Sequence, residues 1–191
     1  MEWRSDGYMR WSKTHPAARF ELTSSGLAPV DLASFGGDSV PVSVENCDNY
    51  GHPELAAQIA RLREVAPERV LPVLGTSMAN VVALACAASP GDCVLFEHPV
   101  YDPLLRAAAF LGIEPVFFDR PAVREFRPNL EQVRLGFENG ARALVLSNLH
   151  NPTGRLCGED CLRGLSDLSE SAGATMIVDE VYLDYARLNG T

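Results

Sequence analysis

The sequence predicts an α/β protein of three layers (α/β/α), in which helices cover both faces of a mostly parallel sheet. Short apolar runs alternate with longer segments of helical periodicity about five times along the chain. This alternation indicates a parallel sheet, because successive parallel strands need a helical crossover between them. Glycine and proline stand at the ends of several of these segments and mark their boundaries.

The first half of the alternation begins at Pro53, a residue suited to the first position of a helix, and apolar residues then recur on one helical face. The apolar run at 70–74 predicts a strand. Its Pro72 cannot donate to a ladder, which places that strand at an edge of the sheet. A helix is predicted at 77–88 and a strand at 93–96.

The second half repeats the pattern up to the strand that ends before Asp179. Gly112 and Gly173 each follow a helical segment, where a left-handed residue commonly ends a helix. Helices are predicted at 103–111, 129–137 and 159–172, and strands at 113–118, 143–147 and 175–178.

The length, composition and net charge of the chain argue against several classes of function. The chain has 191 residues, 47% of them hydrophobic, which suffices for one domain or for part of a larger one. A net charge of −9 argues against nucleic acid or an anionic membrane as partner. The first twenty residues contain no apolar signal segment, and no run approaches the length of a membrane span. We therefore expect a cytoplasmic protein.

The five cysteines form no C-x-x-C pair and are interpreted as thiols of a reducing compartment. Cys157 and Cys161 lie four residues apart on a predicted helix, but a metal there would need further ligands that the sequence does not place nearby. No metal site is predicted.

One predicted strand end, at 75–80, reads G-T-S-M-A-N and runs directly into a helix. A helix N-terminus suits a phosphate, so Thr76 and Ser77 are candidate phosphate ligands. Ser77 as a simple N-cap is the alternative. The segment matches neither the P-loop nor the G-x-G-x-x-G fingerprint, which gives no support to nucleotide binding.

The next strand end carries His98 and Tyr101. The Tyr101 ring either lies over an aromatic ligand or packs on the sheet edge. His98 is either a base or a surface residue.

The last two strand ends carry N-P-T-G at 151–154 and D-E-V-Y at 179–182. N-P-T-G is good turn chemistry, but it also lies where α/β sheets bind ligands. Asp179 ends a buried strand, which is costly unless a group such as a protonated ring nitrogen pairs with it. Capping of the following turn is the alternative for Asp179, and Tyr182 can reach the same ligand.

Taken in order, Y-G at 50–51, G-T-S-M-A at 75–79, P-V-Y at 99–101, N-P-T-G and D-E-V-Y resemble the class I/II aminotransferases. These are fold-type-I enzymes that depend on pyridoxal 5'-phosphate, and the resemblance covers about residues 46–185. It implies amino-acid and 2-oxo-acid substrates and a homodimer. It also implies that 1–45 form an N-terminal arm or part of a small domain, and that 46–191 form an incomplete cofactor-binding large domain.

The resemblance also assigns roles to individual residues. Tyr50 matches a tyrosine that reaches the cofactor phosphate of the partner subunit, and Gly26 matches a glycine near the substrate. The cofactor ligands that it implies within the chain are Thr76 and Ser77 for the phosphate, Tyr101 stacked on the ring, Asn151 and Tyr182 on the phenolic oxygen, and Asp179 on the ring nitrogen.

The chain departs from the family in one respect that concerns the chemistry. The family's Schiff-base lysine lies a few tens of residues after D-E-x-Y, in an S-x-x-K segment, whereas the only lysine here is Lys13. We therefore expect a fragment that lacks the catalytic lysine, with no catalytic residue of its own. The alternatives are a lyase of the same fold, a non-catalytic regulatory module that binds the cofactor, and an inert fragment.

Overall fold

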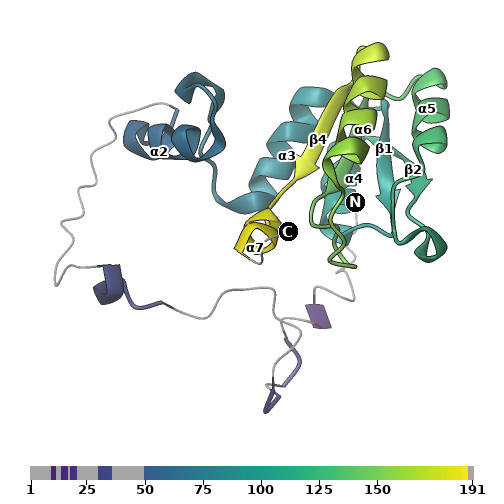
Figure 1. Cartoon of the computed structure of the whole chain (residues 1–191). Helices are drawn as coiled ribbons and strands as arrows, with labels where there is room; N and C mark the ends of the chain where they lie inside the picture. The colour runs from purple at the N-terminus through teal and green to yellow at the C-terminus, as the bar shows by residue number, and fades with distance from the viewer. Residues whose placement is uncertain (1–9, 12–13, 17, 21–29, 36–49, 189–191) are drawn as a thin grey trace. The chain divides into compact units, whose positions relative to one another are not determined.

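The computed structural model describes residues 10–11, 14–16, 18–20, 30–35 and 50–188 (Figure 1). The chain divides into two compact units, Met1–Asn46 and Cys47–Thr191. Within the first unit the described part includes a short 3-10 helix, η1 (Leu32–Phe35). Most of the arm predicted at 1–45 lies outside the described residues.

The second unit is built on a sheet of four parallel strands in the order β2-β1-β3-β4. All four lie where the apolar runs predicted them, which confirms an α/β fold with a parallel sheet. Their bounds are β1 Cys93–His98, β2 Glu114–Asp119, β3 Ala143–Ser147 and β4 Thr175–Asp179.

The five predicted helices are present as α2 to α6, and local chemistry explains their starts. Pro53 opens α2, and the Asn129 side chain accepts a hydrogen bond from the Gln132 amide at the start of α5. A further helix, α7, was not expected. The bounds are α2 Pro53–Arg63, α3 Gly75–Ala87, α4 Asp102–Phe110, α5 Leu130–Glu138, α6 Glu159–Ser171 and α7 Leu183–Leu188, with 3-10 turns η2 Pro67–Arg69 and η3 Ala122–Arg124.

Side-chain alternation along the strands creates two cores, one on each face of the sheet. Val94 and Phe96 of β1 pack with Leu84 of α3 and Leu104 of α4. On the opposite face, a second cluster joins β1 and β3 to α5 and α6, with Leu165 at its α6 side. Figure 1 shows the sheet between these two pairs of helices. The three-layer prediction is therefore confirmed.

The strand predicted at 70–74 is wrong, because the structure assigns no strand there. Leu71 and Leu74 are exposed, Leu74 by 92%. Pro72 lacks an N–H group, and the segment does not pair with any described strand, so an apolar run alone did not suffice. The run instead leads into Gly75, whose φ of 74° starts α3 in a conformation that favours glycine.

The order of the strands places a functional site. From β1 the chain crosses outward to β2, then returns past β1 to β3 and continues to β4. The direction of winding changes between β1 and β3, and in open parallel sheets ligands bind beyond the carboxyl ends at such a point.

Within the described ranges, every helix is too short or too polar to span a bilayer.

Candidate functional site

A cleft lies beyond the carboxyl ends of β1, β3 and β4, beside the first turns of α3. It brings together residues that are far apart in the sequence and close in the fold. They are Thr76, Ser77 and Asn80 from α3, Tyr101 after β1, Ser147 and Asn151 from the end of β3, and Asp179, Val181 and Tyr182 from the end of β4.

Six residues predicted as cofactor ligands therefore line one cleft, although their role in binding the cofactor stays a prediction. The sequence missed the other three. Asn80 lies one helical turn after Ser77, and Ser147 directly precedes the loop of Asn151. Both could have been found from helical spacing and strand alternation.

The α3 end of the cleft is a helix N-terminus. The residue that precedes the helix is Leu74, which offers no side-chain cap, so the interpretation of Ser77 as the N-cap is wrong. Thr76 and Ser77 are the second and third residues of α3, where backbone N–H groups lack carbonyl partners within the helix. The first turn of α3 contains no acidic residue, and such an end of a helix attracts an anion.

Asp179 also lines the cleft and is 7% exposed. The Asn80 side-chain amide donates to its Oδ2 at 2.8 Å, and the Val181 amide donates to its Oδ1 at 3.1 Å. The second contact shows that Asp179 does cap the following turn. The first ties the carboxylate to α3, so a buried anion stands at a fixed position in the cleft.

The N-P-T-G loop is both a tight turn and part of the lining of the cleft. The Gly154 amide donates to the His150 carbonyl at 2.7 Å, which closes the turn. The Asn151 amide donates to Ser147 Oγ at 2.9 Å, which fixes Asn151 at the cleft. The loop is therefore a turn that presents a polar side chain to the site.

Behind this loop lies a buried ion pair that the sequence did not predict. Arg120 Nη1 donates to Glu97 Oε2 at 2.6 Å, and the two side chains are 1% and 0% exposed. Ser147 donates to Glu97 Oε1 twice, from its hydroxyl at 2.6 Å and its amide at 2.8 Å. Burial raises the pKa of Glu97, while the contacts with Ser147 and Arg120 oppose that rise. Glu97 thus fixes the position of Ser147, whose hydroxyl oxygen accepts the hydrogen bond from the Asn151 amide.

His150 links two of the loops. Its Nε2 lies 2.9 Å from the Pro99 carbonyl oxygen, and its Nδ1 lies 2.6 Å from Thr153 Oγ1. A carbonyl only accepts, so Nε2 carries the proton and Nδ1 accepts from the threonine hydroxyl. Neutral His150 therefore satisfies both contacts. Burial, together with the charge of Arg120, lowers its pKa to about 4, although the bond to Pro99 opposes this.

We expect His150 to make the protein less stable as the pH falls from 6.5 towards 4. The pKa of His150 is about 4 in the folded protein and 6.5 as the unperturbed value, so in this window the unfolded chain binds a proton that the folded chain does not. The free energy of unfolding should be measured by urea titration at several pH values. His150→Asn should flatten its dependence on pH in this window.

The matched control for that experiment is His98→Asn. The His98 side chain is 64% exposed, so its replacement should leave the slope nearly unchanged. A His150→Asn variant that keeps the whole slope of the natural protein would contradict this assignment.

Two other predicted candidates lie elsewhere, and a third falls outside the described residues. His98 is exposed and does not line the cleft. Tyr50 is 81% exposed and lines a separate groove with Pro53 and Leu71. Gly26 lies outside the described residues. Among the residues that the structure describes, no three histidine, cysteine or acidic side chains form a group suited to a metal ion.

The cleft fits pyridoxal phosphate on the chemistry of its donors. The N-terminus of α3 suits the phosphate, and the buried carboxylate of Asp179 suits a protonated ring nitrogen. Tyr101 offers an aromatic face, and Asn151 and Tyr182 offer hydrogen-bonding groups to the ring oxygen. A cationic ring with an anionic phosphate would thus meet complementary charges in the cleft.

Comparison with known proteins agrees with this chemistry. A cystathionine beta-lyase of Corynebacterium glutamicum is 27% identical over 61% of this chain and 30% of its own length. A 1-aminocyclopropane-1-carboxylate synthase of Arabidopsis thaliana is 26% identical over 91% of this chain and 36% of its own. A solved PLP-dependent aminotransferase of Streptococcus suis superposes with a TM-score of 0.65 at 28% identity, over 70% of this chain and 36% of that one.

The chain thus spans about a third of the length of these relatives. Within the chain, the match to the family covers residues 44–189. That range contains all six predicted ligands that line the cleft. The chain belongs to the aminotransferase class I and II family.

Proposed function

We propose that the full-length protein containing this chain is a pyridoxal-phosphate-dependent aminotransferase, which transfers an amino group between an amino acid and a 2-oxo acid. Residues 46–191 supply the cofactor-binding part of its large domain. The observation that carries the proposal is the buried carboxylate of Asp179, held by Asn80 in a cleft that the N-terminus of α3 also lines.

Different residues of the cleft bind different parts of the cofactor. Thr76, Ser77 and the amides at the start of α3 hold the phosphate. Tyr101 lies against the ring and excludes water from one face, while Asn151 and Tyr182 hydrogen bond to the phenolic oxygen. The Glu97–Ser147 contacts keep the Asn151 loop in place without touching the ligand.

Asp179 has the electronic role, because a buried anion beside the ring nitrogen favours the protonated form of that nitrogen. The Asn80 amide fixes Oδ2 of Asp179 and stabilises its charge. When bound, the cofactor supplies an electron-withdrawing ring that stabilises negative charge at the substrate α-carbon.

Two further features belong to the proposal. We expect a homodimer in which the exposed Tyr50 reaches the phosphate of the partner subunit's cofactor. We also expect Gly26 to contribute to substrate binding, as the resemblance to the family implies. Crosslinking of the full-length protein tests the dimer, and Tyr50→Phe tests the contact through weaker retention of the phosphorylated cofactor.

The 191-residue chain by itself is expected to bind the cofactor weakly and to catalyse no transfer. Its only lysine, Lys13, lies in the arm and not after the D-E-V-Y motif. Residues 1–191 should be mixed with pyridoxal phosphate, reduced with borohydride and searched for a labelled lysine by mass spectrometry. We expect no stoichiometric adduct on Lys13, with Lys13→Arg as the control. A full adduct together with amino transfer would contradict the proposal.

A lyase is the second candidate, and the similarity to cystathionine beta-lyase favours it. The same buried carboxylate serves both reactions, so the acceptor distinguishes them. An aminotransferase consumes a 2-oxo acid for each amino group moved, in ping-pong kinetics. A β-lyase releases the β-substituent, ammonia and a 2-oxo acid from one amino acid and water, and needs no second 2-oxo acid as acceptor. Assay of the full-length protein with and without a 2-oxo acid decides between them.

A further inference from the structure

Two thiols lie together at the start of α6, away from the cleft. Cys157 is buried, Cys161 is half-buried, and both are free thiols. They line a pocket of about 470 Å³ together with Arg120, Arg127 and Glu159. The two thiols are close enough for each to change the pKa of the other. Neither residue contributes to the proposed cofactor chemistry.

The two thiols differ in mobility and in access. The Cys157 amide donates to Asn148 Oδ1 at 2.9 Å, and the Asn148 side-chain amide donates to the Cys157 carbonyl at 3.3 Å. These two bonds fix the backbone of Cys157, and its side chain belongs to the core between the sheet and α6. Cys161 is the third residue of α6 and is more open to solvent.

We propose that Cys157 and Cys161 form a reversible redox site, in which hydrogen peroxide oxidises Cys161 and Cys157 then closes an intrachain disulfide. The inference is independent of the proposed cofactor and substrates, because it rests only on this thiol pair and its pocket.

Peroxide oxidises the thiol pair in two steps. The Cys161 thiolate attacks one oxygen of the peroxide, so that an S–O bond forms, the O–O bond breaks and the leaving hydroxide takes a proton to become water. The Cys157 sulfur then attacks the Cys161 sulfenic acid, so that the S–S bond forms and the S–O bond breaks. The second hydroxide leaves as water with the Cys157 proton. The thiol pair loses two electrons, and the peroxide gains them.

The surroundings favour Cys161 as the attacking residue. The Cys157 thiol, with Arg120 and Arg127 nearby, lowers the pKa of Cys161 to about 7, while burial opposes that change. The Cys161 thiol and burial raise the pKa of Cys157, with Glu97 contributing and Arg120 opposing. Glu159 and Asp160 also line the pocket and disfavour a thiolate, whereas the N-terminus of α6 favours it.

Mass spectrometry tests the proposal on the 191-residue chain. Trypsin releases one peptide, 156–163, that contains both cysteines, so the disulfide appears as the loss of two hydrogens on that peptide. We expect this loss after stoichiometric peroxide and its reversal by a dithiol reductant. Cys86 and Cys93 share peptide 70–106 and serve as the internal control, which should keep both hydrogens.

Two serine variants separate the roles. Cys157→Ser should stop at a sulfenic acid on Cys161 that a sulfenic-acid trap captures, and Cys161→Ser should leave Cys157 reduced. Circular dichroism of both variants checks that they remain folded. A natural chain whose 156–163 peptide keeps its hydrogens under peroxide that oxidises free cysteine would overturn the proposal. So would a Cys161→Ser variant in which Cys157 oxidises at the natural rate.

Alkylation by iodoacetamide gives a second, independent readout. A pKa near 7 makes about half of Cys161 thiolate at pH 7, against roughly 1% for a thiol of pKa 9.0. Lower intrinsic nucleophilicity cancels part of that gain, leaving Cys161 about fivefold faster than a thiol of pKa 9.0. The exposed Cys86 serves as the comparison within the chain. The advantage should vanish in Cys157→Ala, whose side chain has no hydrogen-bond donor. Equal rates for Cys161 and Cys86 in the natural chain would overturn the assignment of Cys161 as the attacking residue.

Discussion

Replacing Asp179 by alanine is expected to remove most of the turnover of the full-length enzyme. The charge-assisted hydrogen bond that Asp179 offers is worth about 1.5–3 kcal/mol, which corresponds to roughly 10- to 100-fold in rate. Loss of the protonated ring adds to this, because the ring then withdraws electrons less strongly. The measurement is kcat/KM for amino transfer by the natural protein and by Asp179→Ala.

The matched control is Glu180→Ala, which removes the neighbouring carboxylate from the same loop. Glu180 is exposed and does not line the cleft, so this variant should retain near-normal turnover. If Asp179→Ala also retained it, Asp179 would be only the cap of the Val181 turn.

Replacing Glu97 by alanine is expected to lower the free energy of unfolding by about 3–5 kcal/mol, a large part of the stability of a typical domain. Arg120 would remain buried with its guanidinium charge uncompensated, and arginine cannot shed that charge. Its remaining acceptors would be the Phe126 and Ser147 carbonyl oxygens, at 2.7 Å and 3.4 Å. Urea unfolding followed by circular dichroism measures the change.

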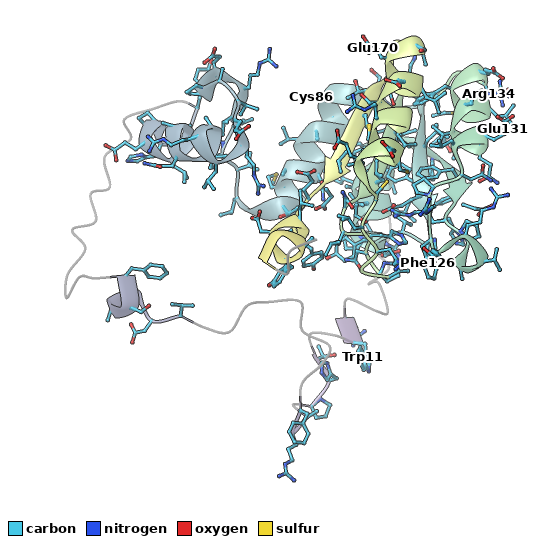
Figure 2. The ribbon with its side chains drawn as sticks, in the orientation of Figure 1. Trp11, Cys86, Phe126, Glu131, Arg134 and Glu170 are labelled. Atoms are coloured by element: carbon cyan, nitrogen blue, oxygen red, sulfur yellow. The ribbon has the colours of Figure 1, made fainter. Side chains whose placement is uncertain are left out.

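An exposed ion-pair cluster on α5 provides the control. Arg134 bonds to Glu131 and Glu138 on the outer surface of that helix, where Glu131 and Arg134 project into solvent (Figure 2). Exposed pairs add little to stability, so Arg134→Ala should unfold at nearly the same urea concentration as the natural protein. Equal effects of Glu97→Ala and Arg134→Ala would contradict the importance of the buried pair.

Much of the fold could be predicted because local signals and packing agree. The buried strand β3 reads as an uninterrupted apolar run, and Asn129 and Pro53 start helices as their chemistry suggests. The run at 70–74 is as apolar as β3, which is why it was predicted to be a strand, yet it forms none. Apolar composition predicts a strand only where a neighbouring strand pairs with it, and pairing is not encoded in five residues.

The cleft was predictable in part because its ligands follow strand ends and helix starts, which the sequence marks. Asp179 and Asn151 each follow an apolar run, and parallel strands bring their carboxyl ends to one edge. The supporting contacts were not predictable. Glu97 and Arg120 are separated by 23 residues, and they meet because the register of β1 and β2 places His98 beside Asp119. From the sequence alone, a charged residue within a strand is expected to face solvent, because its buried partner is not known.

The most direct test of the account is the protonation state of the cofactor ring in the full-length protein. Pyridoxal phosphate labelled with nitrogen-15 in the ring should be bound to the natural protein and to Asp179→Ala, and its nitrogen chemical shift compared. We expect the shift of a protonated ring nitrogen in the natural protein and of an unprotonated one in Asp179→Ala. An unprotonated ring nitrogen in the natural protein, or a protonated one that persists without Asp179, would contradict the placement of the cofactor in this cleft.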